Sequence, residues 1–114
     1  MTDLAPRDAQ SRELLRIRRI DDEHGVVLRL GGELDLASAP ELERQLAEIQ
    51  RHSAGRILID LTNLEFMDST GLALMIRAQQ AAQANGRQLR LRRGSAQVQR
   101  LFELTAVLDR FTFE

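Results

Sequence analysis

The sequence predicts a single α/β domain in which a mixed β-sheet packs against helices. The length of 114 residues suits one domain. After two initial strands, helical and strand-like patterns alternate in the order β-β-α-β-α-β-α, and a short last strand is predicted at 111–113. Helical crossovers between strands imply parallel pairing beyond the first hairpin.

The composition is that of a globular protein, and it narrows the classes of function. Hydrophobic residues make up 43% and charged residues 29%, with a formal net charge of −1. Arginines cluster near residues 16–19 and 87–93, but leucine and isoleucine lie between them, which indicates the solvent-facing sides of strands. The chain has no Tyr or Trp to stack on bases, so we expect no nucleic-acid partner.

The chain has no cysteine, which excludes disulfides, thiolate zinc sites and cysteine nucleophiles. The two histidines, His24 and His52, fall in predicted turns, so a histidine-rich metal site is not expected. No apolar run approaches the roughly 20 residues of a membrane span, and the N-terminus lacks the apolar core of a signal peptide. We therefore expect a cytoplasmic protein without membrane insertion.

The first part of the chain predicts a β-hairpin. Residues 1–13 are polar and aperiodic, and we expect a disordered or loosely ordered lead before a domain spanning 14–114. Strands are predicted at 14–20 and 26–30, joined by a turn of hairpin length. The two strands should therefore pair antiparallel.

A first helix and a central strand follow. Ser38 to Glu41 matches a capping box with an early proline. The helix that follows should bury Leu42, Leu46 and Ile49 and end before Gly55. Residues 57–61 are almost continuously apolar, which predicts a central strand.

The next helix begins with an unusual turn, Asp68-Ser69-Thr70-Gly71, after a short connection. Three residues that can cap a helix stand in a row, and a glycine follows where glycine costs about 1 kcal/mol against alanine. The helix should span Ser69 to Ala84. We expect its inner face to carry Leu72, Met75, Ile76 and Gln79.

The last predicted elements are a strand at 88–92, with one face toward solvent, and a helix that begins at Gly94-Ser95. The buried stripe of that helix should be Val98, Leu101 and Phe102.

Catalytic interpretations of the turn fail on sequence grounds. Ser69 has no G-x-S-x-G elbow, and a phosphate-binding loop would need a lysine that this region lacks. Asp68-Ser69-Thr70-Gly71 also resembles the Asp-Thr-Gly or Asp-Ser-Gly motif of aspartic proteases, but the spacing differs by one residue. In those enzymes β-structure follows the motif, whereas a helical pattern follows it here. Carboxylates are numerous, but each has a local explanation as a cap, turn or strand-end residue, so we expect no metal and no cofactor.

The remaining interpretation is that Ser69 is the substrate of another enzyme. A phosphorylated serine carries about −1.5 to −2 charges, and a helix N-terminus tolerates an anion. Asp68 would repel the phosphate, and Gly71 would allow a partner to approach closely. Thr70 is the second choice, because both hydroxyls lie at the same helix start. Alternatively, Ser69 is simply one of several caps.

Three segments together resemble STAS domains over about residues 14–113. Gly32-Glu33-Leu34-Asp35 resembles their G-E-L-D turn, and the segment from Asp60 to Leu72 resembles their strand–loop–helix signature ending in D-S-[ST]-G-L. Leu101-Phe102-Glu103-Leu104-Thr105 resembles the end of their third helix. Family members commonly carry a further C-terminal helix, for which a sequence ending at Glu114 leaves no room.

The resemblance is strongest to bacterial anti-sigma factor antagonists, which are regulators and not enzymes. It implies binding to an anti-sigma factor that is also a serine kinase, release of a sigma factor, phosphorylation at Ser69 and resetting by a phosphatase. It also implies that the contact surface includes Asp68, Thr70 and Gly71, with Glu33 and Asp35 in the adjacent loop. ATP and Mg²⁺ would belong to the kinase.

Two other functions are compatible with the resemblance. One is a STAS subunit held permanently in a larger assembly, such as a lipid-transport ATPase complex or a stress-signalling scaffold. The other is a nucleotide sensor, which the missing phosphate loop disfavours. The oligomeric state is left open.

Overall fold

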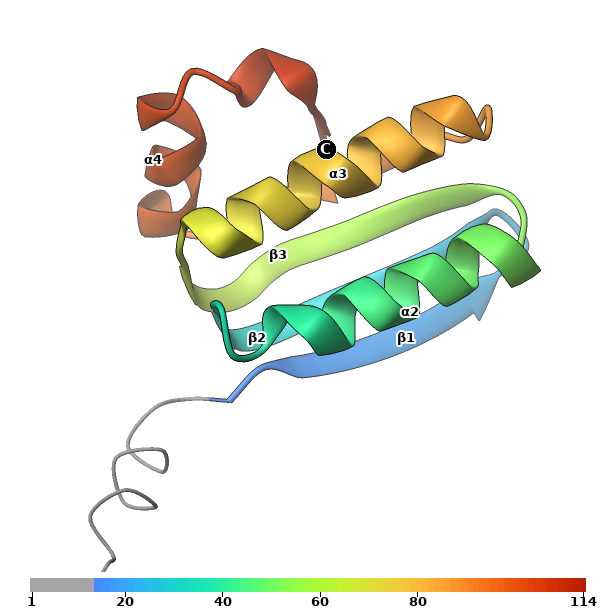
Figure 1. Ribbon diagram of the computed structural model, residues 1–114, viewed down its shortest axis with the longest axis horizontal. Helices are drawn as coiled ribbons and strands as arrows, with labels where there is room; N and C mark the ends of the chain where they lie inside the picture. Colours follow the sequence, from blue (N-terminus) through green and yellow to red (C-terminus); the bar gives the residue numbers. More distant parts are fainter. Residues whose placement is uncertain (1–13) are drawn as a thin grey trace, which may run out of the picture.

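The computed structural model describes residues 14–114, which form a mixed sheet with helices on one face (Figure 1). The strand order follows the sequence, and only the first pair is antiparallel. The predicted fold class is confirmed, including the first hairpin and the short last strand. The strands are β1 (Arg16–Asp22), β2 (Gly25–Leu34), β3 (Arg56–Met67), β4 (Leu89–Arg92) and β5 (Thr112–Phe113).

The helices lie where the apolar periodicity places them. α3 has the predicted bounds, and Figure 1 shows α2 and α3 side by side over the sheet. In residues 14–114, no helix is long and apolar enough to cross a membrane. The helices are α2 (Ala39–His52), α3 (Ser69–Ala84) and α4 (Ala96–Leu104), followed by the 3₁₀ helix η1 (Leu108–Arg110).

The core lies between the sheet and α2 and α3, and includes alternate residues of β2 and β3. The predicted stripe of α2, Leu42, Leu46 and Ile49, is buried. The predicted inner face of α3 is only partly correct, because Ile76 and Gln79 are half-buried. α3 also packs against α2, so its buried surface includes a second row that contains Leu74, Ala78 and Ala82.

An aromatic cluster holds the C-terminal part of the chain. The ring of Phe102 on α4 makes edge-to-face contacts with Phe111 and Phe113, at centroid distances of 5.3 and 5.4 Å. Leu101 is half-buried rather than fully buried. Gln99 is buried instead, because its Oε1 accepts the Gly94 N–H at 2.8 Å.

The strands β2 and β3 are longer than predicted. The prediction ended them at Leu30 and Leu61, whereas they continue side by side to Leu34 and Met67. Two register shifts interrupt this extension, and Gly32 lies there with φ of 82°. Such irregularities break the alternation of apolar and polar residues, which is why periodicity alone missed the extension.

The predicted capping box at Ser38 is wrong. The Ser38 side chain makes no capping hydrogen bond to α2; its hydroxyl donates to the Glu33 carbonyl at 2.9 Å. The Glu41 carboxylate binds Arg44 and Gln45 instead of reaching back to Ser38. Ser38 therefore stabilises the turn that precedes α2, because its hydroxyl bonds to the carbonyl of Glu33 at the end of β2.

Asp60 is a buried carboxylate on the sheet face opposite the helices, with 7% of its surface exposed. Its Oδ1 accepts hydrogen bonds from the Thr62 backbone and hydroxyl at 2.9 and 2.6 Å. Its Oδ2 lies 3.2 Å from Arg92 and 3.6 Å from Arg29. Burial raises the pKa of Asp60, but the bonds from Thr62 and the charge of Arg92 outweigh it and hold the pKa below its ordinary value.

The substitution Asp60→Asn should lower the free energy of unfolding at neutral pH by about 1–3 kcal/mol, because it removes charge-assisted hydrogen bonds. Since folding lowers the pKa of Asp60, its contribution is complete above the ordinary value of 3.8 and is lost as the pH falls below it. Urea denaturation at a series of pH values should therefore show a smaller acid loss in the variant than in the wild type.

Glu114→Gln is the control, because Glu114 pairs with the same Arg92 but is more exposed. It should cost less than about 1 kcal/mol. Equal losses for the two substitutions would contradict a special contribution of Asp60.

Candidate functional site

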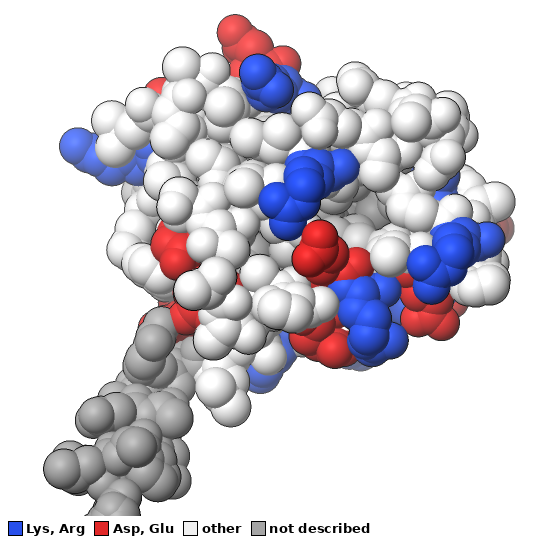
Figure 2. Space-filling model, viewed as in Figure 1, with Lys and Arg blue, Asp and Glu red and all other residues white. Residues whose placement is uncertain are grey.

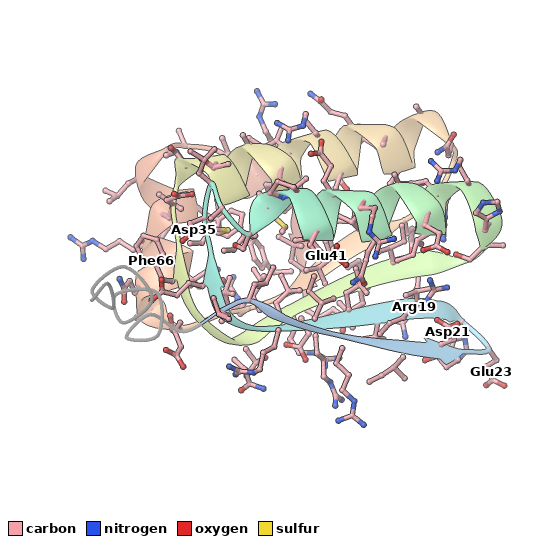
Figure 3. All side chains as sticks on the ribbon, turned by 60° about the horizontal axis from the view of Figure 1, so that its bottom comes forward. Arg19, Asp21, Glu23, Asp35, Glu41 and Phe66 are labelled. Carbon is pink, nitrogen blue, oxygen red and sulfur yellow. The ribbon has the colours of Figure 1, made fainter. Side chains whose placement is uncertain are left out.

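Two turns from distant parts of the sequence lie side by side at one end of the sheet. Leu34 pairs with Met67, and the Asp68 N–H donates to the Leu34 carbonyl at 3.2 Å. Figure 3 shows Asp35 and Phe66 at this same end. The structure thus brings the G-E-L-D turn against the start of α3.

Asp68 is the N-cap of α3, as its side-chain chemistry predicts. Its Oδ1 accepts the N–H groups of Thr70 and Gly71 at 2.9 and 3.2 Å, and its carbonyl accepts the Leu72 N–H at 3.1 Å. The carboxylate therefore satisfies two of the N–H groups that a helix start leaves unpaired.

Ser69 is the first residue of α3 and is exposed, whereas Thr70 is half-buried. The Ser69 hydroxyl makes no hydrogen bond to any other residue in 14–114. Capping is carried out by Asp68, so Ser69 is not needed as a cap. Of the two hydroxyls that the sequence left equivalent, Ser69 is the more accessible to another protein.

Gly71 has a packing role within the domain. It is buried, and a Cβ built on it would lie 2.7 Å from Met67 Cγ and 2.8 Å from Leu34 Cγ. The missing side chain thus gives room to the ends of β2 and β3, which accounts for the glycine by packing within the domain, while its role toward a partner stays a prediction. The glycine lets α3 begin close to the sheet.

The adjoining turn, residues 35–38, is held by its own polar groups. The Asp35 Oδ1 accepts the N–H groups of Ala37 and Ser38, both at 3.1 Å. Glu33, two residues before Asp35 on β2, is half-buried and lies opposite Phe66 in the sheet register. These bonds fix the backbone of the turn.

Leu36 lies in this turn and is 74% exposed, although it is not among the site residues predicted from the sequence. Its signal is a leucine among turn residues, outside any helical or strand periodicity. A hydrogen-bonded turn with an exposed apolar side chain, at the same end of the sheet as Ser69, is a suitable protein contact, because little conformational entropy is lost on binding.

Charges of both signs are interspersed on the face that carries α2 and α3 (Figure 2). Ion pairs within and between the helices account for part of this, including Glu41–Arg44 at 2.7 Å and Glu43–Arg77 at 3.4 Å. The view shows no large field of one sign that would attract a polyanion to this face.

Neither histidine lies near the Ser69 hydroxyl. The backbone carbonyl of His24 accepts a bond from Arg56 at the beginning of β3, whereas Ser69 follows the end of this 12-residue strand. At about 3.3 Å per residue, the strand separates the two sites by tens of ångströms. His52 ends α2, four residues before Arg56, the first residue of β3, and so also lies near the opposite end of that strand from Ser69. In residues 14–114, no three His, Cys, Asp or Glu side chains gather into a metal site.

Comparison with known proteins agrees with this geometry. The model of the STAS domain family matches residues 15–114. The chain belongs to the STAS domain family. An anti-sigma-B factor antagonist of Staphylococcus aureus is 37% identical over 82 residues, which cover 72% of this chain and 76% of that protein.

Two solved structures share this STAS fold. An anti-sigma factor antagonist from Mycobacterium paratuberculosis superimposes with a TM-score of 0.79 at 22% identity, covering 87% of this chain and 84% of that one. Unphosphorylated SpoIIAA, also an anti-sigma factor antagonist, gives 0.73 at 22% identity over 88% and 87% of the chains. SpoIIAA from Bacillus has also been solved in its phosphorylated form.

Gly71→Val should lower the free energy of unfolding by about 2 kcal/mol, because the added atoms meet Leu34 and Met67. Ala73→Val is the matched control, since it places the same side chain at a half-buried position of the same helix. Urea denaturation measures both. Similar losses would show that the Gly71 position is not tightly packed.

Proposed function

We propose that this STAS domain is an anti-sigma factor antagonist switched by phosphorylation at Ser69. It binds an anti-sigma factor with serine kinase activity, and this binding releases a sigma factor to direct transcription. The observation that carries the proposal is the exposed, unbonded Ser69 hydroxyl beside the capping Asp68. The identity with an anti-sigma-B factor antagonist supports the choice of partner.

The contact surface consists of the two adjacent turns. Asp68, Ser69 and Thr70 contribute from the start of α3, and Glu33 and Asp35 from the end of β2 and its loop. Gly71 contributes indirectly, by setting how closely α3 lies to Leu34. Leu36 adds an apolar contact to this otherwise polar surface.

A phosphate on Ser69 acts on the surface rather than on the fold. The N–H groups of Thr70 and Gly71 are already bound by Asp68, so the phosphate does not gain them without displacing the cap. Repulsion from the Asp68 carboxylate directs the phosphate toward solvent. A partner face packed against a neutral hydroxyl then meets about −1.5 to −2 charges, and binding weakens.

This chain acts as a substrate and a binding protein rather than as an enzyme. The kinase supplies ATP and Mg²⁺, and a phosphatase acting on phospho-Ser69 restores binding. No cofactor is needed for either role, and the protein acts without inserting into a membrane or binding nucleic acid.

Incubation with a purified anti-sigma factor kinase and Mg-ATP should place a phosphate on Ser69, located by peptide mass spectrometry. Ser69→Ala should abolish the modification, while Thr70→Val retains it. Ser69→Asp should weaken binding to the anti-sigma factor by at least tenfold, about 1.4 kcal/mol, with an unchanged circular dichroism spectrum. Unchanged affinity of Ser69→Asp would favour a permanently assembled STAS subunit instead.

Leu36→Ser should also weaken binding to the anti-sigma factor, by about 1–2 kcal/mol in isothermal titration calorimetry, because an exposed apolar anchor is lost. Leu104→Ser is the matched control: Leu104 is 72% exposed and ends α4, outside the two turns. Equal effects of the two substitutions would argue against Leu36 as a specific contact.

A further inference from the structure

The sheet face opposite α2 and α3 carries a second distinctive surface, which we call the arginine face. In the sheet register, Arg18, Arg29 and Asp60 lie in one row across β1, β2 and β3, and Arg92 continues it on β4. Figure 3 shows long side chains with nitrogen-bearing ends projecting from the sheet on the side away from the helices. No helix in residues 14–114 is drawn over this side (Figure 1).

An apolar strip lies beneath these arginines. Ile20, Val27 and Leu58 form the neighbouring row, and Arg90 continues it. Leu58 is 1% exposed and lies outside the core cluster that the helices cover. Since no described helix covers it, the long side chains of the same face must shield it, as arginine stems commonly do.

The acidic groups of the arginine face do not balance its arginines. Asp60 is shared by Arg29 and Arg92, and Glu114 by Arg92 and Arg56. Asp22 on β1 also lies 4.0 Å from Arg56. Arg18 and Arg90 form no ion pair with any residue in 14–114. The face therefore presents guanidinium groups without a carboxylate partner in that part of the chain, of which Arg18 is exposed and Arg90 half-buried.

The placement of Arg18 is also unfavourable for folding. Arg18 lies directly opposite Arg29 in the antiparallel pair, and like charges at such positions destabilise a sheet. A local arrangement that opposes stability is expected where a surface serves binding.

We propose that the arginine face binds an acidic segment of a partner protein, separately from the turns that contain Ser69. Carboxylates can pair with Arg18 and Arg90 in the forked geometry that guanidinium groups favour, and apolar side chains of the segment can contact the half-buried Ile20 and the aliphatic stems of the arginines. A second copy of this chain would present the same positive face and be repelled. Bases of a nucleic acid would find no Phe, Tyr or Trp in these two rows for stacking.

The test uses a fluorescein-labelled peptide of alternating glutamate and leucine, with fluorescence anisotropy as the readout. A lysine–leucine peptide of equal length and a single-stranded oligonucleotide are the comparison probes. The acidic peptide should bind at low salt, weaken as salt increases and bind more tightly than either comparison probe. Failure to bind, or tighter binding of the oligonucleotide, would overturn the proposal.

The variant Arg18→Glu with Arg90→Glu should lose at least tenfold in affinity for the acidic peptide. The matched control is Arg51→Glu with Arg100→Glu, which makes the same change in net charge at exposed positions on α2 and α4. Equal losses of affinity in both variants would show that only the net charge of the protein matters, and would overturn the proposed binding site. Circular dichroism confirms that each variant is folded.

Ser69→Asp separates this proposal from the phosphorylation switch. It should leave the affinity for the acidic peptide unchanged, because the arginine face lies on the side of the sheet opposite α3. An affinity change as large as that of the Arg18 and Arg90 variant would show that the two surfaces are one, and would overturn the proposal of a separate site.

Discussion

The parallel pairing of β2 and β3 is the constraint on which the candidate site depends. The pairing continues past the point where each strand's apolar run ends, until Leu34 lies beside Met67 and accepts the Asp68 N–H at 3.2 Å. This contact joins the end of one strand to the beginning of α3. Because backbone hydrogen bonds set the register, the two turns of the STAS signature meet at this end of the sheet, where the Leu34 side chain also packs against Gly71.

The packing at this junction explains why the turn is rich in small and capping residues. Asp68 satisfies the first N–H groups of α3, and Gly71 leaves room for Leu34 and Met67. Of the two remaining residues, Thr70 is half-buried, whereas Ser69 is exposed and does not cap the helix. A modification there can change the surface while the fold is preserved, which is the property that a phosphorylation switch requires.

The two faces of the sheet serve different purposes. One face is covered by α2 and α3 and holds the main core, whereas the other holds ion pairs centred on the buried Asp60. Long arginine side chains shield apolar residues on that second face and keep their charged ends in water. A small domain can in this way present one surface at the end of its strands and another across its open face.

The sequence by itself determined the order of elements, the bounds of α3, the cap at Asp68 and the family signature, because these depend on local periodicity and on residues close in the chain. Tertiary structure decided the length of β2 and β3, the burial of Gly71, the role of Ser38, and the greater exposure of Ser69 than of Thr70. The exposure of Leu36 and the grouping of arginines on one face also appeared only there. Each depends on which distant residues become neighbours, and local patterns do not encode this across the irregular pairing at Gly31 and Gly32.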